Sequence, residues 1–354
     1  MKYHLFILGC QQNYADAEKI SVILHSLGYQ KSSEKEANLV IVVACSVRQR
    51  AVDRVWNIIK SPPAGRKQVK KFIICGCVLP DDKRRMASKV DLFFDSSKIN
   101  NLVHYLKSIN LPIKEIYKAN RKPFGKIGYA SIGIGCNNFC SYCAVPYTRG
   151  REQYFKPQTI LKEAKELISL GCNEIMLLAQ NVNSYNNIDE AGKKTNFINL
   201  LKEVNKLEGD FKITFMSPHP KDTSDELITA LRNLNKLKKE IHLPLQSGDN
   251  EILKKMNRHY TVKHFLNLIK KIRKNIPDMY ISTDIIVGFP TETDEQFKST
   301  YKVCKQAKFD KAFISQYSPR KGTAAEKTLP DDVSREVKKQ RWEILNNLIN
   351  KKIK

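Results

Sequence analysis

The first third of the chain alternates short apolar runs with segments whose apolar residues recur every three or four positions. The run Leu39–Ala44 contains no polar residue, which is typical of a parallel strand covered on both faces by helices. The pattern predicts strands at Lys2–Leu8, Leu39–Ala44, Lys71–Cys75 and Asp91–Phe94, and helices at Asp16–Leu27, Ser46–Ile59, Asp81–Lys89 and Ile99–Ile109. We therefore expect residues 1–118 to form an α/β domain with a doubly wound parallel sheet.

From Lys126 the alternation resumes and contains six strand–helix units. The predicted strands are Gly128–Ile132, Glu174–Ala179, Lys212–Met216, Glu240–Leu243, Tyr280–Val287 and Ala312–Tyr317, and the predicted helices lie near residues 157–170, 196–207, 222–234, 249–256, 261–275 and 293–307. Eight such units close a barrel, so six predict a partial, open one. We expect residues 119–330 to form this partial (β/α)6 barrel, after a basic, proline-flanked linker at about residues 110–126.

The last segment, residues 331–354, has apolar residues at spacings of three and four. They are Val333, Val337, Trp342, Leu345, Leu348 and Ile349. This spacing predicts an amphipathic C-terminal helix.

Hydrophobic residues make up 42% of the 354 residues, but no apolar run approaches the roughly 18 residues that span a membrane. The N-terminal segment also lacks the long apolar region and cleavage site of a signal peptide. We therefore expect a cytoplasmic protein that does not contact a membrane. In that setting nine cysteines indicate metal binding rather than disulfides.

The charge balance is strongly basic, because 61 Lys and Arg oppose 36 Asp and Glu and leave a net charge of +25. A lysine-rich surface that only aids solubility is one interpretation. So large an excess is more typical of a protein that binds a polyanion, since each neutralised phosphate releases counterions. We therefore favour a nucleic acid as the partner.

Three cysteines, Cys136, Cys140 and Cys143, are spaced C-x3-C-x2-C in one short loop. A thiolate trio of this kind can hold one face of a four-iron cluster and leave one iron open for a small molecule. A structural zinc site is the alternative, but it usually needs a fourth ligand, and His219 is too far along the chain for a compact site. A disulfide fits poorly in a chain without a secretory signal.

A second trio is expected in the first domain, where cysteines follow three predicted strands. Cys10 follows the first strand, Cys45 the second, and Cys75 and Cys77 lie at the end of the third. Carboxyl ends of parallel strands share one edge of a sheet, so Cys10, Cys45 and one of the last pair converge there. Three buried structural cysteines are the alternative, and spacing alone does not separate Cys75 from Cys77.

The C-x3-C-x2-C motif, with Tyr142 before its last cysteine, resembles the signature of the radical S-adenosylmethionine (SAM) superfamily. The following residues, Ala144–Gly150, resemble the methylthiotransferase family within it, which modifies tRNA adenosine or a ribosomal protein. The resemblance implies SAM and two [4Fe-4S] clusters as cofactors. It places the radical SAM cluster on the C-x3-C-x2-C trio and matches Cys10, Cys45 and Cys77 to the second cluster.

Five polar segments that follow the barrel strands also resemble family segments. By that resemblance the candidates to line the SAM pocket are Gln180, Asn181, His242, Gln246, Ser247, Asp284 and Glu292. His242 and Asp284 lie on strands, so each is alternatively a satisfied polar residue of the core. The chain departs from the family at Gln153–Pro157, which is one residue longer than the family segment, so a pocket contact usually credited to an arginine is either lost or supplied by Lys156. Cys172 and Cys304 are interpreted as structural.

The motif Gly9-Cys10-Gln11 is most similar to the tRNA branch of the family. The resemblance implies methylthiolation at C2 of an isopentenylated adenosine 3′ of a tRNA anticodon, with tRNA and an electron donor such as flavodoxin or ferredoxin as partners, and no DNA. Alternatives are a threonylcarbamoyl-adenosine tRNA or ribosomal protein S12 as substrate, or a non-catalytic iron–sulfur protein that binds RNA. Relatives in the family usually continue into a small β-barrel domain that binds RNA, and this sequence stops before the corresponding point. We therefore expect affinity for RNA to come from the basic surface of the first two domains or from a partner.

Overall fold

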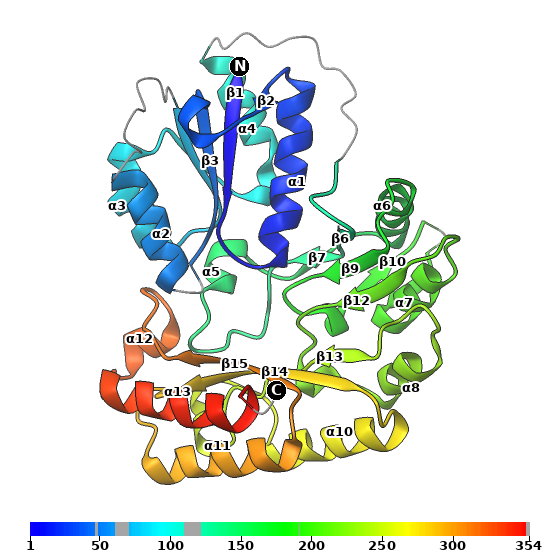
Figure 1. The fold of residues 1–354 in the computed structure, drawn as a ribbon, viewed down its shortest axis with the longest axis vertical. Coiled ribbons are helices and arrows are strands. Elements are labelled where there is room, and N and C mark those ends of the chain that lie inside the picture. Colours follow the sequence, from blue (N-terminus) through cyan, green and yellow to red (C-terminus); the bar gives the residue numbers. More distant parts are fainter. Residues whose placement is uncertain (47–48, 61–70, 110–121, 191, 352–354) are drawn as a thin grey trace.

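The computed structural model describes residues 1–46, 49–60, 71–109, 122–190 and 192–351. An N-terminal α/β domain lies against a barrel formed by the rest of the chain (Figure 1). The predicted class, a parallel α/β domain followed by a partial barrel, is confirmed. The domain boundary at residue 118 falls outside the described residues. Both this boundary and the one at residue 330 stay predictions.

The N-terminal sheet has five parallel strands in the order β2-β1-β3-β4-β5. The strands are β1 (Lys2–Ile7), β2 (Gln30–Lys31), β3 (Leu39–Cys45), β4 (Lys71–Cys77) and β5 (Leu92–Phe94), and the helices are α1 (Gln11–Ser26), α2 (Gln49–Lys60), α3 (Pro80–Met86) and α4 (Asn100–Ser108). Alternate residues of β3 point to opposite faces. Ile41 and Val43 pack with α1 and α4, whereas Val40 and Val42 pack with α2 and α3. This two-sided burial explains why β3 has no polar position.

Two features of this domain differ from the prediction. Helix α1 begins at Gln11 and not at Asp16. Its first turn has no apolar periodicity because it buries polar side chains, and the Asn13 amide donates to the carbonyls of Leu8, Val43 and Ala44. Strand β2 is two polar residues long and gives no sequence signal.

The barrel contains the six predicted strands, each within one residue of its predicted ends. They are β6 (Ile127–Ser131), β9 (Glu174–Leu178), β12 (Lys212–Phe215), β13 (Glu240–His242), β14 (Tyr280–Val287) and β15 (Lys311–Gln316). All pairs are parallel, and a bridge from Ile213 to Leu237 joins the β6-β9-β12 and β13-β14-β15 groups. The helices are α6 (Pro157–Ser169), α7 (Phe197–Asn205), α8 (Asp225–Asn233), α9 (Asn250–Lys255), α10 (Val262–Asn275) and α11 (Asp294–Ala307). The strands therefore form an open arc covered by helices.

The C-terminal helix α13 (Arg335–Ile349) packs on this arc and does not stand apart from it. Leu345 and Ile349 belong to the hydrophobic core of the barrel, and the Trp342 indole donates to the Ile314 carbonyl at 2.9 Å. Cys172 and Cys304 lie in the same core, as expected of structural residues. None of the described helices is long and apolar enough to cross a membrane.

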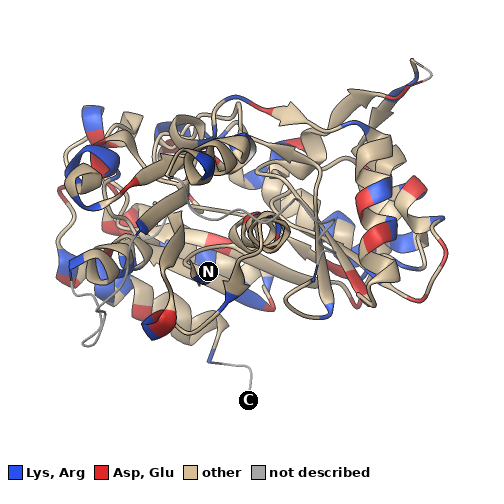
Figure 2. Ribbon diagram, turned by 90° about the horizontal axis from the view of Figure 1, so that it is seen from above, with Lys and Arg blue, Asp and Glu red and all other residues tan. Residues whose placement is uncertain are grey.

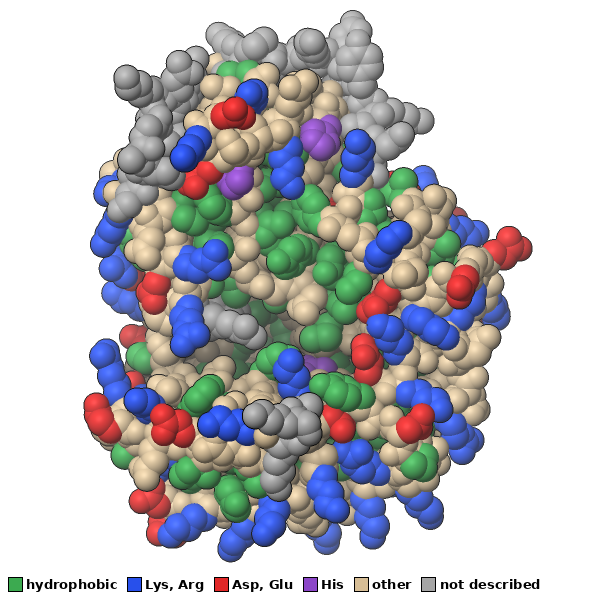
Figure 3. All heavy atoms as spheres, viewed as in Figure 1, with side chains coloured by type: hydrophobic (Ala, Val, Ile, Leu, Met, Phe, Trp, Pro, Cys, Tyr) green, Lys and Arg blue, Asp and Glu red, His purple; other side chains and the backbone are tan. Residues whose placement is uncertain are grey.

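The two domains meet at the carboxyl ends of both sheets. Ala15 of α1 packs against Met176 and Leu178 of β9, and the Gln12 amide donates to Ser131 Oγ at the end of β6. On the other side Lys321, which follows β15, lies 3.4 Å from Asp81. The face in Figure 3 is hollowed between the two domains, with hydrophobic side chains above the hollow. Ligands of parallel α/β proteins bind at this kind of edge.

Candidate functional site

The loop that carries Cys136, Cys140 and Cys143 begins with a glycine that no other residue can replace without strain. Gly135 has φ +78°, and a Cβ there would lie 2.1 Å from the Arg151 carbonyl oxygen. Its N–H donates to Gln180 Oε1 at 2.5 Å. Gln180, one of the predicted SAM-pocket residues, therefore fixes the entry to the cysteine loop.

Neighbouring segments hold the rest of the loop. The Asn257 amide donates to the carbonyls of Asn138 and Phe139 at 3.1 and 3.0 Å. Ser141 Oγ donates to the Lys255 carbonyl at the end of α9, at 2.7 Å. These hydrogen bonds preorganise a loop that has no regular structure of its own.

A buried arginine contacts this first trio. Arg258 Nη1 donates to Cys140 Sγ at 3.4 Å. Burial lowers the pKa of Arg258, but Tyr142, Tyr260 and Cys140 together raise it by more. Its pKa is therefore above the usual value, and the guanidinium stays charged. Burial raises the pKa of Cys143, as does Cys140 beside it, and a backbone hydrogen bond from Val145 opposes this.

The second trio lies at the edge of the N-terminal sheet. Cys45 and Cys77 are paired in register on β3 and β4. A Cβ on Gly9 would lie 2.8 Å from Cys45 Cβ, so Cys10, the next residue, comes to the same edge. Burial raises the pKa of Cys77, Arg149 lowers it, and Cys10 raises it by a smaller amount. Cys75 instead lies in the hydrophobic core of the sheet.

The two trios face each other across the domain interface, and Arg149 lies between them. It is the last residue of α5 (Val145–Arg149), which follows Cys143 by two residues. Arg149 Nε donates to Cys77 Sγ at 2.9 Å, and Nη2 to Asp16 Oδ2 at 2.8 Å. Burial lowers the pKa of Arg149, but Cys77 and Asp16 raise it well above its usual range.

The chemistry of both trios fits an iron–sulfur cluster, because thiolates are the ligands of such clusters. Among the described residues, no three His, Cys, Asp or Glu side chains form a group that could hold a metal ion. Each trio also has a buried guanidinium on one sulfur, and such hydrogen bonds are typical of cluster sites.

The predicted SAM-pocket residues divide into two groups, of which the first faces the barrel interior or the cysteine loop. Asn181 follows Gln180 and donates to Asp222 at 3.3 Å, while its buried Oδ1 has no hydrogen-bond partner in the described part of the chain. His242 Nε2 lies 3.0 Å from Asp284 Oδ2. The Gln246 N–H donates to the Asp284 carbonyl at 2.8 Å. The Asp284 side chain is 40% exposed, so it is not a core residue.

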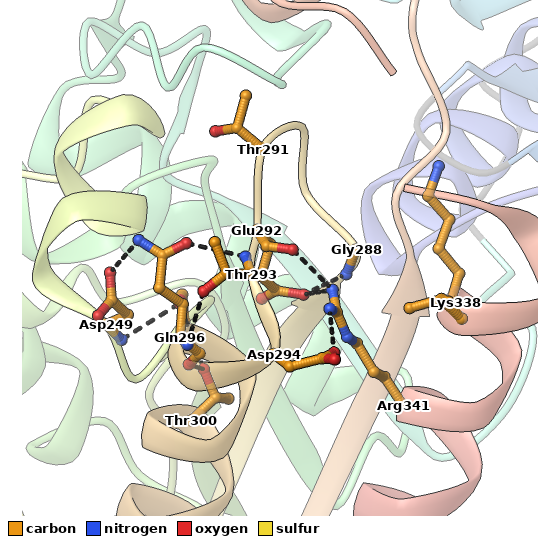
Figure 4. A network of polar contacts seen from close by, with 12 residues as sticks. Asp249, Gly288, Thr291, Glu292, Thr293, Asp294, Gln296, Thr300, Lys338 and Arg341 are labelled. Carbon is orange, nitrogen blue, oxygen red and sulfur yellow. Dashed lines mark hydrogen bonds and ion pairs between the residues drawn. The ribbon is translucent and has the colours of Figure 1, made fainter. Parts of the chain in front are cut away.

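Ser247 and Glu292 form the second group and pack away from the cysteine loop. Ser247 is fully buried 3.4 Å from Thr300 Oγ1 of α11. The Glu292 carboxylate accepts from the Gly288 N–H at 2.7 Å and from Arg341 of α13 at 2.9 Å (Figure 4). Glu292 therefore stabilises the turn after β14 from the side on which α13 packs.

Lys156 does not enter the pocket. It is exposed at the N-cap of α6. The segment that departs from the family pattern forms β8 (Gln153–Tyr154), which pairs antiparallel with β7 (Gly133–Ile134). This segment therefore braces the strand before the cysteine loop.

Arg149, Arg258 and Asp16 are residues of the candidate site that sequence reasoning did not single out. Arg149 stands in the family-like stretch after Cys143, which was its only signal. Arg258 lies more than a hundred residues from Cys140, and its contact depends on the fold alone.

Comparison with known proteins agrees with this geometry. Residues 130–304 match the Radical SAM superfamily, and residues 2–95 match the Uncharacterized protein family UPF0004. The fold and the first cysteine loop therefore define a radical SAM enzyme.

The relatives narrow the family. The tRNA-2-methylthio-N(6)-dimethylallyladenosine synthase of Clostridium perfringens is 40% identical over 98% of this chain and 81% of the relative. The enzyme of the same name from Thermoanaerobacter sp. is 41% identical over 99% of this chain and 78% of the relative. The chain belongs to the family of tRNA-2-methylthio-N(6)-dimethylallyladenosine synthases, which are transferases of the radical SAM class. The predicted cofactors, SAM and two [4Fe-4S] clusters, are those of this family.

Solved structures share the fold at low identity. The radical SAM methyltransferase TsrM from Kitasatospora setae, with cobalamin and a [4Fe-4S] cluster bound, has a TM-score of 0.64 and 12% identity and covers 92% of this chain and 76% of its own. The cobalamin-dependent SAM radical enzyme OxsB has a TM-score of 0.58 and 10% identity over 99% of this chain and 56% of its own. These similarities confirm the two-part architecture.

The ion pair between Arg341 and Glu292 should support the barrel. Both side chains are at least 95% buried, so Arg341→Gln leaves a buried carboxylate without its cation. We expect the free energy of unfolding to fall by about 3–5 kcal/mol. Urea unfolding followed by circular dichroism measures this, with Arg335→Gln, exposed on the same helix, as a control that changes it by no more than about 0.5 kcal/mol. Equal effects of the two substitutions would contradict the role of the pair.

Glu292 should also make stability depend on pH. Burial raises its pKa from 4.5 to about 6, against the opposing effects of Gly288 and Arg341. The folded protein therefore holds this proton more tightly than the unfolded chain, and a contribution of about 2 kcal/mol, present below pH 4.5, is lost as the pH rises through about 6. We expect the difference in unfolding free energy between the wild type and Glu292→Gln to change over this window in urea titrations. A difference that is constant with pH would show that the carboxyl titrates normally.

Proposed function

We propose that this protein transfers a methylthio group to C2 of N6-dimethylallyladenosine, 3′ of the anticodon in tRNA. The observation that carries the proposal is the meeting of two cysteine trios at one domain interface. One trio holds the cluster that binds SAM, on Cys136, Cys140 and Cys143. The other trio, Cys10, Cys45 and Cys77, holds the second cluster. When bound, these groups supply the radical chemistry and the sulfur needed to replace an inert C–H bond.

The chain itself positions and encloses these groups. Gln180 and Asn257 fix the first loop, and Arg258 stabilises negative charge on Cys140. His242, Gln246 and Asp284 line the barrel interior, where polar groups orient SAM or the adenine. The buried Asn181 Oδ1 has no hydrogen-bond partner in the described part of the chain and suits a donor group of a ligand. The N-terminal domain covers the carboxyl end of the barrel and excludes water from the reaction.

Transfer RNA is the partner that best accounts for the charge. The relatives are named as enzymes that modify a tRNA nucleoside, and the net charge of +25 suits a phosphate backbone. Lys and Arg are distributed over helices around the whole molecule, with acidic residues between them (Figure 2). Of the linker residues, Lys122 is described, while Lys114, Lys118 and Arg121 lie outside the described residues. Radical SAM chemistry also requires an electron donor, such as a flavodoxin or ferredoxin.

The function is tested by mass spectrometry of tRNA nucleosides from cells with and without the gene. We expect 2-methylthio-N6-dimethylallyladenosine to disappear without it and to return with the wild type and with Cys304→Ala, a core cysteine outside both trios. Cys136→Ala and Cys10→Ala should each leave the unmethylthiolated nucleoside. An unchanged nucleoside profile in the deletion would contradict the proposal. A loss of methylthiolated threonylcarbamoyladenosine, or of ribosomal protein modification, would assign a different substrate.

A further inference from the structure

Arg149 joins the two cysteine trios physically. Helix α5 carries it directly from the loop of Cys143. Its side chain, 4% exposed, donates to three partners that all belong to the N-terminal domain. They are Cys77 Sγ at 2.9 Å, Asp16 Oδ2 at 2.8 Å and Ser96 Oγ at 3.3 Å.

The geometry of the guanidinium suits this position. Its planar fork presents donors in several directions at once, whereas a lysine ammonium offers one compact charge. Asp16 is itself fixed from both domains, because the Gln12 amide donates to Asp16 at 3.1 Å and to Ser131 of β6 at 3.2 Å. The orientation of Arg149 toward Cys77 is therefore set by the docking of the two domains.

Charge balance gives Arg149 a second effect. Arg149 and Asp16 alone form a neutral buried pair, so a cluster held by Cys77 adds negative charge beside a fixed cation. Hydrogen bonds and charges at ligand sulfurs tune the stability and potential of a cluster. Arg258, which contacts Cys140, occupies the corresponding position at the other trio.

We infer that Arg149 is a positioning residue through which the radical SAM loop controls the second cluster: it holds the Cys77 sulfur in place and stabilises the reduced cluster there. The inference rests on the proposed function, since it assumes that Cys10, Cys45 and Cys77 hold a cluster. It predicts that a residue of the barrel domain governs the second cluster and leaves its own domain's cluster unaffected.

The test uses the full chain in two backgrounds, each of which retains one trio. The first background carries Cys136→Ala, Cys140→Ala and Cys143→Ala and so retains only the second trio. The second background carries Cys10→Ala, Cys45→Ala and Cys77→Ala and so retains only the loop trio. In each background we make two variants. The Arg149 double variant combines Arg149→Gln with Asp16→Asn, which removes the ion pair without leaving a buried charge, and the matched variant is Arg258→Gln. Asp16→Asn alone is the further control, because it retains the guanidinium on Cys77. After anaerobic reconstitution, iron content, the electron paramagnetic resonance spectrum and the midpoint potential are measured.

In the first background we expect the Arg149 double variant to lose at least half of the bound iron or to lower the midpoint potential, with a changed spectrum. The potential falls because the cation that is removed contacts the ligand sulfur and donates to it, whereas the anion removed with it contacts only the guanidinium. Asp16→Asn alone removes a buried anion and retains the cation on Cys77, so it should leave the iron content unchanged and should not lower the potential. Arg258→Gln should leave both at the parental values there. In the second background only Arg258→Gln should have an effect.

Unchanged iron, spectrum and potential for the Arg149 double variant in the first background would overturn the inference alone, and so would an equal effect in both backgrounds. Absence of iron from the first background with Arg149 intact would overturn the assignment of the second trio, and the inference with it. Arg149→Lys adds a rescue test, because it retains the positive charge without the planar fork. We expect partial recovery of the midpoint potential, and no recovery would contradict the claim that the charge of Arg149 stabilises the reduced cluster.

Discussion

Parallel strands end at one edge of a sheet, and in this protein two such edges face each other. That constraint places the cysteines, because residues at the carboxyl ends of β1, β3 and β4 converge at this edge. The same constraint brings the loop after β6 and β7 to the opposite side of the interface. Between the edges, the hydrogen bonds of Arg149 to Asp16 and Cys77 link the two domains. The site therefore exists only while the domains are docked.

The barrel and the C-terminal helix depend on buried charge as well as on apolar packing. Lys338 and Arg341 of α13 are almost fully buried, at positions that an apolar stripe would assign to hydrophobic residues. Arg341 contacts the turn after β14 through its ion pair with Glu292. The Lys338 side chain packs on Gly288 of the same turn, where an added Cβ would lie only 2.3 Å from Lys338 Cγ. The helix thus determines the shape of a loop at the mouth of the barrel.

Much of this architecture could be predicted from the sequence, because strands buried on both faces leave a signal that depends on neighbouring residues alone. The uninterrupted apolar run of β3 is the clearest case. The spacing of Cys136, Cys140 and Cys143 is local in the same sense. What escaped prediction depends on contacts distant in sequence, such as that of Arg258 with Cys140.

Polar residues gave the weakest signals. The first turn of α1 and the two residues of β2 have no apolar pattern. Glu292 lies in a segment that resembles a pocket, yet its carboxylate turns toward α13 because a buried arginine lies there. Spacing left Cys75 and Cys77 open, whereas the fold puts Cys75 in the core and Cys77 opposite Cys45.

The central claim, that two separate cysteine trios each hold a cluster, is tested most directly by counting iron in anaerobically reconstituted protein. We expect about eight iron atoms per chain in the wild type and in Cys75→Ser, and about four in Cys136→Ala and in Cys77→Ser. Cleavage of SAM, followed as release of 5′-deoxyadenosine, should persist in Cys77→Ser and be lost in Cys136→Ala. About four iron atoms in the wild type, or loss of iron in Cys75→Ser but not in Cys77→Ser, would contradict the account.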